Sequence, residues 1–305
     1  MAEKGNKRPL ILGCLVVMLV LALAAGVIVF LLYQQRPNPE GPQQPSQPKT
    51  SQNLRNPPTG QPTGSARELV LMTWNVRGYP EKDQASRSWF TAELAKLAPD
   101  VLCIQEIADQ AKVSTFMSTE RRFTKYVFTD SPDGQDNAIF GDDQVEVKAL
   151  PAPTGFQHPA EAAYVTCGGF DAAVVTVHLS WTDKTKREHE KGLLKGLVAQ
   201  ALKTDPDVIV CGDFNTEEPD ISALASSCGL KVLAPSNVTT AGTTHAGHRY
   251  DWILITPNLE QKGETIGAEI VTFSGSEMPT AKRVSDHLPV RARFRTDESF
   301  RDRQR

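Results

Sequence analysis

A run of 24 residues, Leu10–Tyr33, contains no charged side chain and almost no polar group. About 20 consecutive apolar residues are enough for a helix to cross the hydrocarbon core of a bilayer, so this run predicts a single transmembrane helix. Three basic residues at positions 4–8 precede it, and only Arg36 follows within about 15 positions. Because basic flanks are retained on the cytoplasmic side, we expect a cytoplasmic N-terminus at residues 1–9 and an extracytoplasmic remainder.

The same run could belong to a cleaved signal peptide, because Ala22-Leu23-Ala24 has the small-x-small form of a cleavage site. Cleavage there would leave the apolar residues 27–32 exposed to water near the new N-terminus, which is unfavourable. An uncleaved, single-pass membrane anchor is therefore the favoured interpretation.

Composition divides the rest of the chain. Residues 34–65 number 32, of which 8 are proline, and Gln, Ser, Thr and Asn make up most of the others. Such a segment has too few apolar side chains to form a core, so it predicts a Pro/Gln-rich linker. Residues 66–305 are long enough to bury a sizeable core. We expect one domain at residues 66–296 and a C-terminal tail at residues 297–305.

Charge follows the same division. The first 65 residues carry six basic and two acidic side chains, a net charge of +4, and because the whole chain is −3, the remainder carries −7. An acidic domain is a poor generic binder of nucleic acid, since sequence-independent affinity for phosphates comes from Lys and Arg. A bound metal ion could still supply positive charge at a local phosphate site.

Short β-rich runs alternate with helical patterns, which is typical of an α/β domain dominated by sheet. Runs such as Val208-Ile209-Val210 are apolar at consecutive positions, as expected for strands covered on both faces. Strands are expected at 68–75, 100–106, 125–128, 135–141, 145–150, 162–167, 172–179, 207–213, 231–234, 249–256, 268–273 and 288–294. Helices are expected at 85–97, 110–120, 184–203 and 221–227. Gly168-Gly169 predicts a hairpin turn.

The five cysteines give no firm disulfide framework. Cys14 lies in the apolar run, and Cys103 and Cys211 lie in strand-like runs, where a free thiol behaves as a small hydrophobic group. Only Cys167 and Cys228 remain as candidates for a disulfide.

Polar residues recur where apolar runs stop, and catalytic or ligand-binding groups in sheet proteins commonly project from strand ends. Each one alone fits a turn or a helix cap. Together, in this order, they predict a site. The residues are Asn75, Glu106, His178, Asp213, Asn215, Asp251, Asp286 and His287.

The segments that hold these residues resemble the successive motifs of the endonuclease/exonuclease/phosphatase superfamily, which includes deoxyribonuclease I-like metal-dependent phosphoesterases. The resemblance runs from residue 68 to residue 294. It implies a four-layer α/β sandwich of two packed β-sheets with outer helices, and one active site at a shared sheet edge. The segments are Thr73-Trp74-Asn75-Val76-Arg77, Leu102-Cys103-Ile104-Gln105-Glu106, Val177-His178-Leu179, Gly212-Asp213-Phe214-Asn215, Tyr250-Asp251-Trp252-Ile253 and Ser285-Asp286-His287-Leu288-Pro289-Val290.

The resemblance also implies hydrolysis of a phosphate ester with a divalent cation, usually Mg²⁺, with Mn²⁺ or Ca²⁺ as alternatives. Mg²⁺ prefers oxygen ligands and keeps several waters, so one or two carboxylates are enough to bind it. Glu106 is the predicted direct ligand and Asn75 lies beside it. Asp286 would be a further oxygen ligand or a water-mediated contact.

Catalytic roles follow for the other residues. His287 is the natural base if Asp251 accepts its second ring N–H and fixes the tautomer. Asp213 would orient the attacking water, and the superfamily leaves open whether the aspartate or the histidine takes the proton. Asn215 would donate its amide N–H to the phosphate oxygens. His178 would bind phosphate or protonate the leaving oxygen.

The chain also departs from deoxyribonucleases of this superfamily. Those enzymes carry an Arg-Glu pair on a central strand, and the nearest match here, Ala160-Glu161, lacks the arginine. The acidic partner expected for His178 is not evident, with Glu120 the candidate. His245 and His248 could line the site or lie on a solvated loop.

These patterns predict a membrane-anchored, Mg²⁺-dependent phosphoesterase whose first-choice substrate is nucleic acid. The alternative substrate is a phospholipid, a phosphoinositide or sphingomyelin, which the anchor would bring within reach. A catalytically inactive binding module on a membrane stalk is the third interpretation, and the intact set of site residues argues against it. The sequence indicates no protein partner.

Overall fold

The computed structural model of the chain describes residues 68–79, 82–237 and 242–296. The expected membrane helix at Leu10–Tyr33, the linker and the C-terminal tail lie outside these residues. Within the described ranges, no helix is both long enough and apolar enough to cross a bilayer.

The described residues form twelve strands, six α-helices and one short 3₁₀ helix. In chain order the elements are β1 (Glu68–Asn75), α2 (Gln84–Leu97), β2 (Val101–Ile107), α3 (Gln110–Thr119), β3 (Phe123–Phe128), β4 (Asp136–Asp142), β5 (Glu146–Ala149), β6 (Glu161–Cys167), β7 (Phe170–His178), α4 (Lys184–Thr204), β8 (Val208–Asp213), α5 (Asp220–Ser227), β9 (Lys231–Val232), β10 (Asp251–Ile255), α6 (Pro257–Gln261), β11 (Thr265–Ile270), η1 (Gly275–Glu277), α7 (Met278–Val284) and β12 (Val290–Arg295).

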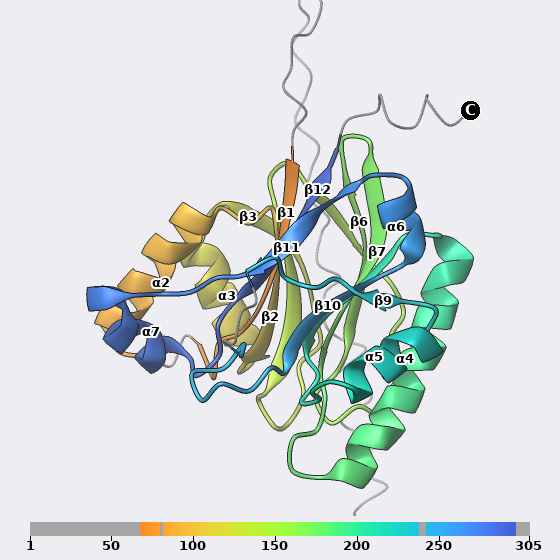
Figure 1. The fold of residues 1–305 in the computed structure, drawn as a ribbon. Helices are drawn as coiled ribbons and strands as arrows, with labels where there is room; N and C mark the ends of the chain where they lie inside the picture. Colours follow the sequence, from red (N-terminus) through yellow and green to blue (C-terminus); the bar gives the residue numbers. More distant parts are fainter. Residues whose placement is uncertain (1–67, 80–81, 238–241, 297–305) are drawn as a thin grey trace, which may run out of the picture. The chain divides into compact units, whose positions relative to one another are not determined.

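The strands form two six-stranded sheets. Sheet A has the order β11-β12-β1-β2-β4-β3, and sheet B has the order β5-β6-β7-β8-β10-β9. Within each sheet the central pair is parallel, β1 with β2 and β7 with β8, and the other pairs are antiparallel. The two sheets pack against each other through strands such as β1 and β8 or β2 and β7. Figure 1 shows α2, α3 and α7 outside one sheet and α4 and α5 outside the other. This arrangement confirms the predicted sandwich of two packed sheets with outer helices.

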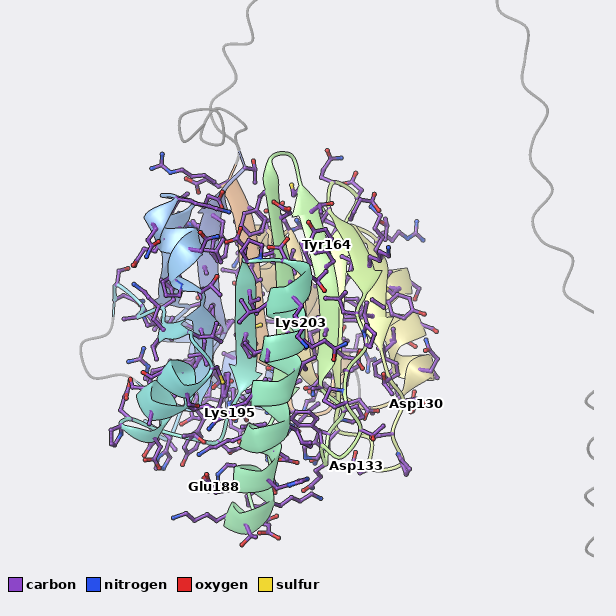
Figure 2. All side chains as sticks on the ribbon, turned by 90° about the vertical axis from the view of Figure 1, so that its right-hand side faces the viewer. Asp130, Asp133, Tyr164, Glu188, Lys195 and Lys203 are labelled. Carbon is purple, nitrogen blue, oxygen red and sulfur yellow. The ribbon has the colours of Figure 1, made fainter. Side chains whose placement is uncertain are left out.

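Apolar side chains cover both faces of the sheets, as the uninterrupted apolar runs predict. One buried cluster joins sheet A to α2 and α3 through residues such as Phe90 and Phe116, and it also includes Val174 and Ile209 of sheet B. A second cluster joins the other face of sheet B to α4 and α5. Figure 2 shows α4 lying lengthwise over sheet B. Burial between the layers thus fixes how the strand ends meet.

The four longest helices and all twelve strands form where the sequence predicts them, with bounds that differ by a few residues. Three of these helices begin at aspartates whose side chains accept a backbone N–H of the first turn, namely Asp83, Asp109 and Asp183. The hairpin predicted at Gly168-Gly169 joins β6 to β7. The helical elements α6, η1 and α7 were not predicted, because a helix of seven residues or fewer completes at most two turns and shows too little periodicity.

The cysteines correct one expectation. Cys167 and Cys228 are both buried, and they pack in different apolar clusters. The suggested disulfide between them is therefore wrong, because each thiol fills space on a different face of sheet B. Cys103 and Cys211 are buried in the core, as predicted.

Candidate active site

The predicted catalytic residues lie at strand ends along one edge of the two sheets. His178 ends β7 and Asp213 ends β8, and the two are paired in the parallel register. Asp251 begins β10 and is paired with Asp213 across the antiparallel ladder. In sheet A, Asn75 ends β1 and Glu106 lies near the end of β2. Residues far apart in the sequence therefore converge because their strands stop at a common edge.

Gly212 sets the position of Asp213. A Cβ atom at Gly212 would lie 2.0 Å from the carbonyl oxygen of Val177 on β7, and the residue has a φ of +131°. Only glycine fits so close to a neighbouring backbone in this conformation. Two residues after Asp213, Asn215 has a left-handed φ of 46°, and its backbone N–H donates to Asp213 Oδ1 at 2.9 Å. The turn therefore holds both side chains at the sheet edge.

Asp251 and His287 form a hydrogen-bonded pair. His287 Nδ1 lies 2.8 Å from Asp251 Oδ2, and His287 Nε2 lies 3.7 Å from Asp213 Oδ2. Burial alone lowers the pKa of His287, but the carboxylates of Asp251 and Asp213 outweigh burial and raise that pKa to about 10. Burial also raises the pKa of Asp251, against the effect of His287. The unlike charges at hydrogen-bond distance favour a proton on the imidazole and a negative charge on Asp251.

Asn75 connects the acidic residues of the two sheets. Its Nδ2 donates to Glu106 Oε1 at 2.9 Å and to Asp213 Oδ2 at 3.1 Å. His178 Nε2 lies 4.0 Å from Glu106 Oε1 and 3.7 Å from Asp213 Oδ2. Glu106 has a φ of 63°, a conformation that is uncommon for a side chain of this size and is concentrated at functional sites. Two carboxylates and a histidine thus face one small volume.

A serine holds the segment that carries Asp286 and His287 against β1. Ser285 Oγ donates to the carbonyl oxygen of Asn75 at 2.6 Å and accepts the backbone N–H of His287 at 2.9 Å. Trp74 Nε1 donates to the carbonyl oxygen of His287 at 3.1 Å. These contacts explain why the Ser-Asp-His segment needs serine, and why tryptophan precedes Asn75.

The remaining predicted residues also line the site. Asn215 Nδ2 donates to the carbonyl oxygen of Leu179 at 2.9 Å, and because an amide group has two N–H donors, a second one is left for a ligand. Asp286 lies at the rim, where its side chain is 55% exposed and lies 3.8 Å from Arg77 Nη1.

These residues surround a cavity of about 410 Å³, which is in the size range of small-ligand sites. Arg77, Trp181 and Tyr250 line it and were not among the predicted site residues. Arg77 and Tyr250 lie inside motif segments, which is the signal that could have found them. The lining residues are Arg77, Glu106, Gln135, His178, Trp181, Asp213, Asn215, Thr244, Ala246, His248, Tyr250, Asp286 and His287. A second cavity of about 430 Å³, between α4 and α5, contains none of the predicted residues.

The acidic residues fit a divalent cation. In the part of the chain that the structure describes, Asp213, Asp251 and His287 form a cluster whose ligand atoms lie within 4.8 Å of one another. The nitrogen of His287 nearest Asp251 is already hydrogen-bonded to it, so this cluster also fits a catalytic pair. The predicted ligand Glu106 is nearby, and a single amide group separates its carboxylate from that of Asp213. Oxygen-rich surroundings of this kind suit Mg²⁺, which needs few protein ligands.

The structure corrects the candidate partner of His178. The carboxylate of Glu120 is hydrogen-bonded to Thr91, away from the site. The His178 ring instead stacks on His158, with centroids 4.5 Å apart, and His158 Nδ1 lies 3.1 Å from Asp133 Oδ2. Figure 2 shows Asp133 on a loop near the lower end of α4.

The sequence left open whether His245 and His248 line the site, and the structure places the two residues differently. His248 lines the cavity, is about half exposed, and lies 3.1 Å from Glu217. His245 does not line the cavity, and its Nε2 is buried without a partner among the described residues. Glu161 is buried and also lies outside the cavity lining, so neither it nor Ala160 forms a wall of the site.

Solved structures with the same architecture come from several organisms. D. rerio TDP2 complexed with a single-strand DNA product is 19% identical, with a TM-score of 0.57 over 75% of this chain and 99% of that chain. A Bacteroides thetaiotaomicron endonuclease/exonuclease/phosphatase family protein is 15% identical, with a TM-score of 0.58 over 77% and 100% of the two chains. The human nocturnin catalytic domain with bound sulfate is 19% identical, with a TM-score of 0.54 over 74% and 94%. Comparison with curated proteins gave no match.

A two-sheet sandwich whose acidic residues and histidines meet at one sheet edge suits metal-assisted hydrolysis of a phosphate ester. The model of the endonuclease/exonuclease/phosphatase family matches residues 72–287, and the chain belongs to this family. Members of the family are divalent-metal-dependent phosphoesterases and nucleases. The protein is therefore a phosphoesterase of this family.

Proposed function

We propose that the protein is a membrane-anchored, Mg²⁺-dependent phosphodiesterase whose substrate is nucleic acid. One observation supports the chemistry most strongly, namely the hydrogen-bonded pair of Asp251 and His287 beside Asp213. A carboxylate that orients a histidine toward a reacting group is a recurrent device of general acid–base catalysis.

In the proposed reaction a water attacks phosphorus and the bond to the leaving oxygen breaks. Asp213 orients the water, and either Asp213 or His287 Nε2 takes its proton, since both face the same space. Asp213 is the favoured base, because the raised pKa of His287 keeps a proton on its imidazole at neutral pH, and His287 accepts a proton only after losing that one. His178 protonates the leaving oxygen or binds the phosphate. The free N–H of Asn215 donates to a phosphate oxygen, which stabilises developing negative charge.

Glu106, Asn75 and Asp286 are the proposed residues around the metal ion. When bound, a divalent cation neutralises negative charge on the phosphate oxygens during in-line attack. The residues after position 65 carry a net charge of −7, so the domain has no excess of Lys and Arg to attract phosphates. Binding of a phosphate therefore depends more strongly on the cation.

Nucleic acid is the favoured substrate because one protein of similar fold, D. rerio TDP2, is known as a complex with a single-strand DNA product. A second candidate is a membrane phospholipid or sphingomyelin, which the apolar run Leu10–Tyr33 would bring close. The 32-residue linker argues against a site that needs bilayer contact, since a chain of this composition extends by up to about 3.1 Å per residue.

The test is an assay of the full chain with Mg²⁺ or with a chelator. Single-stranded DNA, duplex DNA, RNA, sphingomyelin and an inositol polyphosphate are the substrates. We expect turnover of nucleic acid that the chelator abolishes. Turnover of a lipid alone would favour the second candidate, and no metal-dependent turnover of any substrate would favour a binding module.

The site itself is tested by two variants. Asp213→Asn and His287→Ala should each lower kcat by about 100-fold or more, the usual contribution of a general acid or base. His189→Ala is the matched control, because His189 lies on the exposed surface of α4, and it should keep full activity. Unchanged turnover in the Asp213 and His287 variants would show that the catalytic centre lies elsewhere.

A further inference from the structure

Trp181 is an exposed indole on the wall of the catalytic cavity. Its exposed fraction is 64%, the highest among the large hydrophobic residues that the structure describes. Trp74 and Trp252 are buried in the core. A single exposed hydrophobic residue is common on protein surfaces, so exposure alone indicates nothing. The position of Trp181 beside His178 and Asp213 in the cavity lining is what calls for an explanation.

The backbone that carries Trp181 is fixed on two sides. The backbone N–H of Ser180 donates to Glu190 Oε2 at 2.7 Å, and Glu190 is fully buried. Arg187 Nη1 donates to the carbonyl oxygens of Ser180 at 2.7 Å and of Trp181 at 3.3 Å. The indole is therefore presented from a rigid support. A ligand that contacts it avoids part of the entropic cost of ordering a loop.

A second aromatic surface lines the same cavity. The rings of His248 and Tyr250 are stacked, with centroids 5.1 Å apart and an angle of 5° between their planes. Glu217 Oε1 lies 3.1 Å from His248 Nδ1 and so restrains this pair. Flat aromatic faces beside a phosphodiester centre suit a substrate that carries a planar ring close to its phosphate.

We propose that Trp181 is a substrate-binding residue that stacks on an unpaired nucleobase next to the scissile phosphate. This inference rests on the proposed function and narrows its substrate to single strands or strand ends. Every base offers a flat face to an aromatic side chain, so stacking tolerates any sequence. In a duplex both faces of an internal base are covered by its neighbours, and stacking on Trp181 first requires that the base leave the stack.

The choline group of a phospholipid is the competing ligand, because a quaternary ammonium is attracted by aromatic faces and by the carboxylates that line the cavity. Arg77 in the same lining suits a substrate with several phosphates, although it lies 3.8 Å from Asp286. Turnover of sphingomyelin against turnover of nucleic acid therefore separates the two ligands.

The test compares the full chain in detergent micelles with its Trp181→Ala and Trp181→Phe variants, in the presence of Mg²⁺. The substrates are a single-stranded deoxyoligonucleotide, the same strand with abasic residues flanking the cleaved bond, and the duplex. Trp181→Ala should raise KM for the normal strand by about 10-fold or more, the loss expected for one stacked base, with a smaller change in kcat. Trp181→Phe should retain most of the affinity. On the abasic strand Trp181→Ala should match the wild type.

Tyr126→Ala is the control, because Tyr126 is 42% exposed but does not line the cavity, and its KM should equal that of the wild type. Equal KM values for Trp181→Ala and the wild type on the normal strand would overturn the inference and leave the proposed function intact. So would equal KM values of the wild type for normal and abasic strands, a measurement that needs no variant. Turnover of sphingomyelin with none of nucleic acid would overturn both.

Discussion

Among single residues, Glu161 is a buried carboxyl group that opposes folding at neutral pH. It lies at the start of β6 with an exposed fraction of 3%, and its Oε1 has no hydrogen-bond partner among the described residues. Burial, with a smaller contribution from Asp136, raises its pKa from 4.5 to about 7. The folded chain therefore holds this proton more tightly than the unfolded chain. Protonation stabilises the fold fully below about pH 4.5, and the effect is lost as pH rises through about 7.

Glu161→Gln should remove this dependence on pH. The variant should gain stability relative to the wild type between pH 5 and pH 8, by roughly 1–3 kcal/mol, because a shift of one pKa unit corresponds to about 1.4 kcal/mol. Urea unfolding at the two pH values measures the difference. Glu68→Gln, at an exposed position of β1, is the control and should show no such gain. A stability difference between Glu161→Gln and the wild type that stays constant with pH would contradict the prediction.

The sequence predicts well which polar residues at strand ends belong to the site. It does not reveal residues whose role depends only on where the fold places them. Asp251 and His287 were expected to pair, and they lie at hydrogen-bond distance. Trp181 and Glu190 were not expected to matter. A tryptophan in a turn and a glutamate on a helix look like ordinary surface residues until the fold brings one to the cavity and buries the other.

Among the structural elements, the approach of β7 to β8 depends on Gly212. We expect Gly212→Ala to lower the free energy of unfolding by roughly 3 kcal/mol or more, because the added methyl group would overlap Val177 O and the residue would keep an unfavourable φ. Thermal unfolding measures the loss. Gly192→Ala in α4 is the matched control. No atom lies within 4 Å of a Cβ there, so it should stabilise the protein by about 0.5–1 kcal/mol. Equal melting temperatures for Gly212→Ala and the wild type would disprove the close approach.

Element type was predictable where the pattern was long. The 21 residues of α4 and the apolar run of β8 each carry a clear signal. The five residues of α6 begin with a proline, and the seven of α7 include one at the second position, so each resembles a loop in the sequence. Short elements of this kind are set by the chain on either side, because α7 packs against α2 and leads directly into Ser285.

At the scale of the whole molecule, the sandwich followed from the resemblance of six short segments to one superfamily, and not from periodicity alone. Periodicity predicts strands, but it does not say that β1 and β8 face each other. The hydrogen bond from Asn75 to Asp213 joins the two sheets at the site, and it becomes visible only in the folded chain. The sequence also did not predict which loops line the cavity, because loop paths depend on the packing of the layers beneath them.

The apolar run Leu10–Tyr33 is the proposed membrane anchor. The acidic remainder of the chain has no excess of basic residues to hold it on an anionic lipid surface, so attachment should depend on Leu10–Tyr33 alone. The full chain should stay in the membrane pellet after an alkaline carbonate wash. A chain that begins at residue 66 should be soluble and keep its metal-dependent activity on a soluble substrate, because the site lies within residues 75–287. A mature N-terminus at Ala25, or release of the full chain by the wash, would show that the run is not a permanent anchor.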